Sequence, residues 1–476
     1  MTDRSRKKGL MTALDDPPAA VRPRRPARRS FALLGSLQVT LIFTLAAIAV
    51  PLPEIGDRFG LGRDELVLLS AAYGLTFAGL LLFGGRLADR YGGRRTLIAG
   101  LLLFAVASVA APLAPGYGTL LAARFAQGAG AAVIAPAAMA VLRTLFPEPS
   151  AYRRVMATWG GLSVLGATAG NVLSGVVSAL SSWRWALAVP TVVAVVALWL
   201  APRWLPGDRG RRRSGPLDVP GAVLATAGLV AASYGLVRTD AWSWGSARVL
   251  GPLAAGAVLL AVFAVVERRA RDPLLPPGFL RDGRRVFGLA ATALTAAGTS
   301  TVFVLFSLHL QDERGWSALR TSAAFLPFAA ALLVSGRAAG RLVGRYGPGA
   351  VTCGGLALGA AGLGLLALTG FDAGVPYGSG VLPGFVLLPA GAAVSFAGAA
   401  VLATDRVPAG RTGLAGGVHN TAMEVGPTVV FAVLLAVGGD RASLAAAAVL
   451  FAVVAIAARA ARPTLTPLSY THPSKP

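Results

Sequence analysis

One acidic residue, Glu424, lies inside a long apolar stretch and is the residue of this sequence best suited to proton chemistry. The stretch from Leu414 to Val437 contains no other acid, lysine or arginine. A carboxyl group in such surroundings changes its hold on a proton when water or a charge reaches it. Asn420 precedes Glu424 by four residues, so the two side chains share a face if the stretch is helical. This pattern predicts a group that carries a proton or recognises a cation. The alternative is a structural polar contact between helices.

A basic residue, Arg124, also lies in an apolar stretch, together with Gln127. Because a charge in apolar surroundings is costly, we expect Arg124 to face a watery cavity or an acidic partner, and Glu424 is the candidate partner. The alternative is that the side chain of Arg124 extends to the polar surface at the nearer end of its helix.

Other polar side chains in apolar stretches are candidates for contact with a substrate or a proton: Asn171, His419, Gln38 and Gln311. For Asn171 and Asn420, hydrogen bonds to a substrate and simple contacts between helices are both open. His419 is either a proton relay or an interfacial residue. Aromatic or apolar walls for a binding pocket are expected from four residues: Tyr73, Trp159, Phe325 and Phe385.

Apolar helices must position these residues. The chain of 476 residues is 55% hydrophobic and 14% charged, and a helix needs about 20 apolar residues to cross a hydrocarbon core of about 30 Å. The apolar runs therefore predict an all-α membrane protein with fourteen transmembrane helices. The helices are expected to begin near these residues: Phe31, Leu66, Thr96, Thr119, Val155, Ala186, Val219, Arg248, Val286, Arg320, Ala350, Gly380, Leu414 and Leu444.

The net charge of +23 raises the question of nucleic-acid binding. The basic residues lie in short loops between apolar runs, mainly on the side that carries both termini. This distribution indicates a lipid bilayer as partner rather than nucleic acid, and it predicts that both termini of a multi-pass cell-membrane protein are cytoplasmic.

An internal repeat divides the chain. The segment GRLADRYG at 85–92 recurs as GRLVGRYG at 340–347, and GAAV at 130–133 recurs at 391–394. Parallel halves of six helices follow, with two inserted helices between them. The predicted parts are a disordered basic tail (1–30), a first bundle (31–205), the inserted helices with their linkers (206–285), a second bundle (286–460) and a tail (461–476).

The segment that follows the second predicted helix resembles the cytoplasmic signature of the major facilitator superfamily. The resemblance implies that its residues form a gating motif: Gly85, Asp89, Arg90, Gly92, Arg94 and Arg95. The segment from Leu120 to Gly130 is similar to the second signature of that family, in which the arginine, here Arg124, is implicated in proton transfer.

Several further segments resemble the fourteen-helix drug:proton antiporters of this superfamily, among them 52–55, 183–185, 310–315 and 420–426. This resemblance implies proton-coupled efflux of small amphipathic molecules, such as drugs or antibiotics, by alternating access. It implies neither an enzyme nor a cofactor, and a monomer is expected.

Two departures from the antiporter pattern favour other interpretations. Thr44 stands where the subfamily usually has a membrane aspartate, and the fifth helix reads GATAGN at 166–171 in place of the glycine- and proline-rich antiport signature. The alternatives are a proton-coupled importer of the same fold and a membrane receptor or scaffold that no longer transports.

Composition argues against ATP-driven pumps and metalloenzymes. No lysine lies between Lys8 and Lys475, and a phosphate-binding loop needs a lysine directly after its glycines. The acidic residues are too scattered along the chain for a metal site.

Overall fold

The computed structural model describes residues 25–460 apart from 49–50, 181, 209–217, 239–241, 271–272, 277, 373, 406, 409–410 and 437–438. Every regular element in the described residues is helical, which confirms the all-α fold class. The long helices are α2 (Arg25–Ala46), α4 (Arg63–Tyr91), α5 (Gly93–Ala110), α6 (Tyr117–Leu145), α7 (Pro149–Leu180), α8 (Trp183–Trp204), α9 (Val219–Val237), α10 (Ala247–Arg269), α11 (Gly283–Leu308), α13 (Leu326–Tyr346), α14 (Pro348–Leu365), α16 (Leu382–Thr404), α17 (Thr412–Ala436) and α18 (Asp440–Ala460). The short helical elements are α3 (Leu52–Phe59), η2 (Phe279–Arg281), η3 (His309–Glu313), α12 (Ala318–Ala324), η4 (Leu366–Gly370) and α15 (Tyr377–Gly380).

Eleven helices among the described residues are long and apolar enough to cross a membrane. A shorter apolar stretch, Pro220–Leu236, makes up most of α9, and α7 and α17 contain 32 and 25 residues. The observed helices begin close to the starts predicted from the apolar runs. The number of fourteen membrane-spanning helices stays a prediction.

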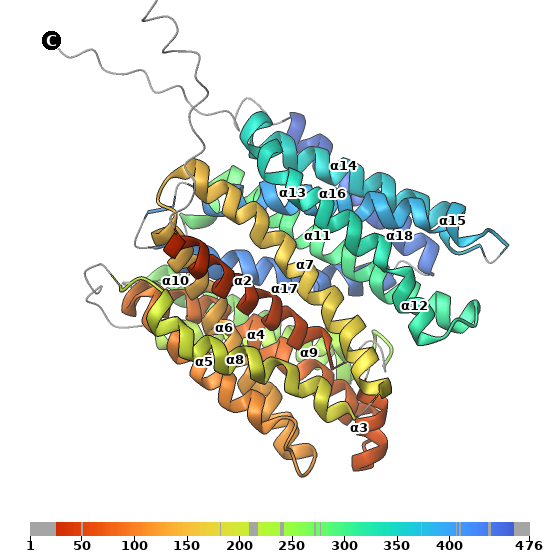
Figure 1. Cartoon of the computed structure of the whole chain (residues 1–476), viewed down its shortest axis with the longest axis horizontal. Helices are drawn as coiled ribbons and strands as arrows, with labels where there is room; N and C mark the ends of the chain where they lie inside the picture. Colours follow the sequence, from red (N-terminus) through yellow and green to blue (C-terminus); the bar gives the residue numbers. More distant parts are fainter. Residues whose placement is uncertain are drawn as a thin grey trace, which may run out of the picture.

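The long helices form two bundles that lie side by side (Figure 1). The first bundle contains α2 and α4 to α8, and the second contains α11, α13, α14 and α16 to α18. The inserted helices α9 and α10 pack against each other, and α9 also contacts α4 and α17.

The two ends of the molecule are named as follows. The end where α2 begins and α18 ends is the terminal end, and the end that carries α3, α12 and α15 is the opposite end. The sequence boundaries predicted for the parts stay predictions.

The two copies of the repeated segment occupy equivalent turns at the terminal end. The first joins α4 to α5 and the second joins α13 to α14. Each turn contains a glycine with positive φ, Gly92 at 95° and Gly347 at 79°, a conformation that side chains other than glycine rarely adopt. One position differs in chemistry, because Gly344 in the second copy replaces Asp89 of the first.

Asp89 connects the two bundles at the terminal end. Its Oδ1 accepts a hydrogen bond from the backbone N–H of Gly413 at 2.7 Å, and its Oδ2 accepts one from Leu414 at 2.9 Å. Both N–H groups belong to the first turn of α17, where a helix has no internal acceptors and carries partial positive charge. The carboxylate of α4 in the first bundle therefore caps a helix of the second.

Small residues bring the bundles into close contact around this cap. The backbones of Gly85 and Gly413 touch, and a methyl group at Gly417 would lie 2.7 Å from the carbonyl oxygen of Leu81. The hydrophobic core of the first bundle continues through buried residues of the second, including Ala339 and Ala397. The terminal end between the bundles is thus closed by backbone contact and by a shared core.

The arginines of the predicted gating motif lie within the first bundle. Asp208, which follows α8, accepts hydrogen bonds from the backbone N–H groups of Arg94 at 2.9 Å and Arg95 at 3.1 Å. The guanidinium of Arg94 donates to the carbonyl of Pro202 at 2.6 Å, and that of Arg90 lies 5.5 Å from the ring centre of Tyr91. Asp208 therefore caps α5 in the way that Asp89 caps α17, and no sequence pattern predicts this contact.

Replacement of Asp89 by Asn should weaken the closed terminal end, since charge-assisted hydrogen bonds to the first turn of α17 are lost. We expect the population with separated bundles to rise about tenfold. Spin labels can be attached at the exposed positions of Tyr91 and Tyr346, one in each bundle, in a variant that also carries Cys353→Ala. The distance between the two labels should then be longer in Asp89→Asn than in the parent. Asp208→Asn is the matched control, because it removes an equivalent cap inside one bundle and should leave these distances unchanged. Equal distance distributions for Asp89→Asn and the parent would contradict the role of the cap.

The contact of α17 with α11 gives a prediction about stability. A Cβ at Gly426 would meet the backbone of Ala293, so Gly426→Ala should lower the free energy of unfolding by about 1 to 3 kcal/mol. Nothing surrounds Gly364 within 4 Å of such a Cβ, and Gly364→Ala should raise stability by roughly 0.5 to 1 kcal/mol. Thermal unfolding of both variants in detergent, measured beside the parent, tests the difference in sign.

Candidate functional site

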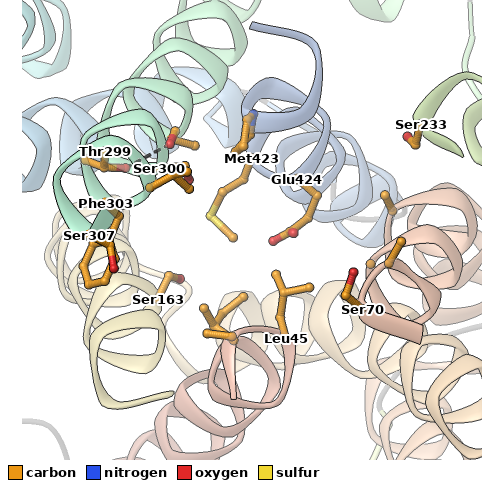
Figure 2. Close-up of a pocket in the computed structure, with 18 of the residues that line it drawn as sticks. Leu45, Ser70, Ser163, Ser233, Thr299, Ser300, Phe303, Ser307, Met423 and Glu424 are labelled. Carbon is orange, nitrogen blue, oxygen red and sulfur yellow. Dashed lines mark hydrogen bonds between the residues drawn. The ribbon is translucent and has the colours of Figure 1, made fainter. Parts of the chain in front are cut away.

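A cavity of about 560 Å³ lies between the two bundles. Its walls come from the middle and the opposite-end halves of α2, α4, α7, α11 and α17, with further residues from α9, α13 and α16. Figure 2 shows the side chains of α17 and α11 facing those of α2, α4 and α7 across it. The closed terminal end lies on one side of this cavity.

The lining of the cavity combines apolar surface with hydroxyl groups and one acid. The apolar side chains include those of Phe303, Phe328, Phe396 and Met423, and the hydroxyl groups are those of Ser70, Ser163, Ser233, Thr299, Ser300 and Ser307. Among the described lining residues, Glu424 alone is ionisable. Such a surface suits an amphipathic molecule with few polar groups better than a sugar.

Helix α17 presents Glu424 to the cavity near the middle of its length. The side chains of Met423 and Glu424 both point into the open space (Figure 2). Pro427, which also lines the cavity, has no N–H and leaves the carbonyl of Met423 without the helical hydrogen bond it would accept. The backbone beside Glu424 therefore offers a further acceptor in the same region.

Two predicted site residues hold lining hydroxyl groups instead of lining the cavity themselves. Gln38 donates from Nε2 to Oγ of Ser163 at 2.9 Å, and Gln311 donates from Nε2 to Oγ of Ser307 at 3.1 Å. Both amides therefore fix the orientation of a hydroxyl that a ligand would meet.

Arg124 and Gln127 form a separate buried polar cluster. Arg124 is 0% exposed, and its Nη1 donates to the carbonyl of Thr44 at 2.9 Å and to Oε1 of Gln127 at 3.4 Å. Its guanidinium lies 5.1 Å from the ring centre of Tyr73. Thr44, the residue that departs from the antiporter pattern, thus meets the arginine with its backbone carbonyl.

The expected ion pair between Arg124 and Glu424 does not form in the described part of the chain. The hydrogen bonds of Arg124 go to Thr44 on α2 and to Gln127, one turn further along α6 itself. The alternative of a surface-reaching arginine also fails, since the side chain is fully buried.

Helix α17 places the remaining predicted residues away from the cavity. Asn420 donates to the carbonyl of Gly416 at 2.8 Å and to the sulfur of Met139 at 3.3 Å, so it makes the contact between helices that was the alternative interpretation. His419 is buried and does not line the cavity. Helix α7 contains Asn171, but its side chain lies outside the described residues.

The expected aromatic walls were assigned to the wrong residues. Tyr73, Trp159, Phe325 and Phe385 are all buried in the cores of the bundles, and the cavity takes its aromatic surface from Phe303, Phe328 and Phe396. Sequence reasoning also missed the lining serines and threonine. Their only signal is the presence of hydroxyl residues on one helical face of an apolar run, as for Thr299 and Ser307, which are eight residues apart on α11. Many hydroxyl residues in helices share this signal.

Comparison with known proteins identifies the family. A model of the Major Facilitator Superfamily matches residues 32–431. The puromycin resistance protein pur8 of Streptomyces alboniger is 36% identical over 88% of this chain and 84% of its own length. The cephamycin export protein CmcT of Amycolatopsis lactamdurans is 37% identical over 88% of this chain and 86% of its own length. The tetracenomycin C resistance and export protein of Streptomyces glaucescens is 30% identical over 84% of this chain and 73% of its own length.

A solved structure shares the fold. The human organic anion transporter MFSD10 superposes with a TM-score of 0.64 at 17% identity, over 91% of this chain and 100% of the other. At this identity the likeness concerns the fold alone. Two packed bundles, a closed terminal end, a cavity between the bundles and the match over residues 32–431 lead to one conclusion: the chain belongs to the Major Facilitator Superfamily and is a multi-pass membrane transporter of small molecules.

Proposed function

We propose that this transporter exports small amphipathic molecules in exchange for protons, with Glu424 as the group that binds either a proton or the substrate. The observation that carries the proposal is the position of Glu424 as the only ionisable side chain among the described residues that line the cavity between the bundles. A carboxyl group in a site alternately reached from two sides can take up a proton on one side and release it on the other.

The remaining lining of the cavity supports an amphipathic substrate. Aromatic rings and the thioether of Met423 provide apolar contact, while hydroxyl groups and Glu424 provide a small number of polar contacts. The names of the relatives support export, because they describe resistance to puromycin and export of cephamycin and tetracenomycin C.

We place the protein in the cell membrane with both termini cytoplasmic, on the basis of the basic loops on that side. The terminal end then faces the cytoplasm, and the closed contact of Asp89 with α17 belongs to a state that faces outward. Fourteen spans follow if α7, α9 and α17 cross the membrane in addition to the eleven apolar helices. The chain is proposed to act as a monomer.

Replacement of Glu424 by Gln should abolish proton-driven transport, since the amide keeps the size of the side chain but cannot exchange a proton. In inverted membrane vesicles with an imposed proton gradient, we expect the parent to take up fluorescent amphipathic substrates and Glu424→Gln to match vesicles without the protein. Asp57→Asn is the control, because Asp57 is an exposed acid of α3 that does not line the cavity.

An importer is the second candidate, favoured by the sequence GATAGN at 166–171 in α7. Accumulation of a solute in right-side-out vesicles, with no uptake in inverted ones, would establish that direction and reject export. Normal proton-driven uptake by Glu424→Gln would reject the assigned role of this acid.

A further inference from the structure

Helix α11 ends, at the opposite end of the molecule, in a single turn of π-helix, η3. The backbone N–H of Arg314 closes this turn by donating to the carbonyl of His309 at 3.1 Å. Turns of this kind are rare and commonly mark functional positions. Gln311, within the turn, donates to Oγ of Ser307, which lines the central cavity. The geometry of η3 therefore affects the cavity wall.

The side chains of η3 form a chain of hydrogen bonds around an enclosed imidazole. The side chain of His309 is 0% exposed. Its Nδ1 lies 2.8 Å from Oε2 of Glu313, and its Nε2 accepts a hydrogen bond from Nε of Arg314 at 3.2 Å. Because the nitrogens of arginine can only donate, Nε2 of the ring carries a lone pair. The neutral ring then has its proton on Nδ1, where it donates to Glu313.

Arg314 and His309 also connect η3 to the loop that follows η4. Nη2 of Arg314 donates to the carbonyl of Asp372 at 2.7 Å. The ring of His309 meets that of Phe371 edge-on, with the ring centres 5.1 Å apart. The five residues His309, Glu313, Arg314, Phe371 and Asp372 are called the His309 cluster below.

The charges around the imidazole come mainly from η3 itself. In the described part of the chain, the hydrogen bonds and ion pairs of His309 go to Glu313 and Arg314. The side chain of Glu313 is 57% exposed and links the ring to water. The carboxylate of Asp372 accepts from the backbone N–H of Gly374 in its own loop at 2.9 Å. The remaining charged residues of η3 and of the neighbouring helices α12 and α18 are Asp312, whose side chain lies outside the described residues, Arg320, Asp440 and Arg441.

A proton on Nε2 of His309 is incompatible with the hydrogen bond from Arg314. Two N–H groups would then face each other across 3.2 Å, and two positive charges at that distance repel. Histidine is the side chain that ordinarily changes its charge between about pH 5 and 8. The guanidinium of Arg314 must therefore leave the ring when the proton binds, and its bond to the carbonyl of Asp372 loses this support.

We propose that His309 is a proton-binding site separate from the central cavity, and that its protonation releases η3 from the loop after η4. The intact His309 cluster excludes a proton from Nε2, so it is stable at high pH and loses stability as the pH falls. Because Gln311 of η3 bonds to Ser307, protonation of His309 also acts on the cavity wall. With both termini cytoplasmic, as proposed above, the cluster lies on the outer side of the membrane.

Fluorescence quenching by Trp316 tests the inference. The ring centre of Trp316 lies 5.7 Å from that of Tyr377, and a bimane label on a cysteine at the exposed Ser379 is two residues further along. The purified full chain carries Ser379→Cys and Cys353→Ala. The same chain with Trp316→Phe gives the unquenched intensity at each pH.

We expect quenching by Trp316 to be strong at about pH 8 and weak at about pH 5. The population with an intact cluster should fall about tenfold, since a hydrogen bond from a charged group is lost. Equal quenching by Trp316 at the two pH values, or none at the higher one, would overturn the inference.

Four variants assign the response to the ring of His309. His309→Gln can still donate to Glu313 and accept from Arg314 but binds no proton, so quenching should stay strong at both pH values. Arg314→Ala should give weak quenching at both. Glu313→Gln removes the other titratable group and should respond to pH as the parent does. His419→Gln, in a buried histidine of α17, should also respond as the parent does.

A pH response that persists in His309→Gln would assign the titration to another group and reject the inference. The measurement uses neither a substrate nor a proton gradient. Its result is therefore independent of proton-coupled export and of the role proposed for Glu424.

Discussion

The contact between the carboxylate of Asp89 and the first turn of α17 is the interaction on which the rest of the arrangement depends. It supplies two charge-assisted hydrogen bonds between helices of different bundles, at a point where α17 has unsatisfied N–H groups. The adjacent glycines allow the backbones to touch, and with the terminal end closed in this way the space between the bundles lies around the middle of α17. The position of Glu424 in the cavity follows from that geometry, since Glu424 is three turns along the helix that Asp89 caps.

The structure separates Glu424 and Arg124, which the sequence analysis expected to form a pair. Glu424 faces the cavity, whereas Arg124 is enclosed by Thr44, Gln127 and Tyr73. Helices α6 and α17 do touch, but near Met139 and Gly416, while Arg124 lies several turns away toward the opposite end. The hydrogen bond of Arg124 to the carbonyl of Thr44 links α6 to α2.

The helices, the repeat and the place of Glu424 inside an apolar helix could be predicted, because hydropathy and the rarity of charge act locally along the chain. The residues that line the cavity could not be predicted from the sequence. Hydroxyl residues in helices commonly bond back to the carbonyl four residues earlier, as Thr40 and Thr301 do here, so nothing in the sequence distinguishes these from Ser233 or Ser300. Which serine faces a cavity depends on the rotation of each helix in its bundle. The cap of α5 by Asp208 depends likewise on a contact between residues more than a hundred positions apart.

The substitution of Gly344 for Asp89 in the second copy of the repeated segment makes the interface between the bundles unequal at its two edges. At one edge α4 holds α17 through a charge. At the other, α13 meets α7 without a side chain at position 344 to accept a hydrogen bond. The second edge thus lacks the charged hydrogen bonds of the first and relies on apolar contact, and we expect the halves to part there first. We then expect the two bundles to rotate about the contact between α4 and α17, against which the inserted helix α9 packs.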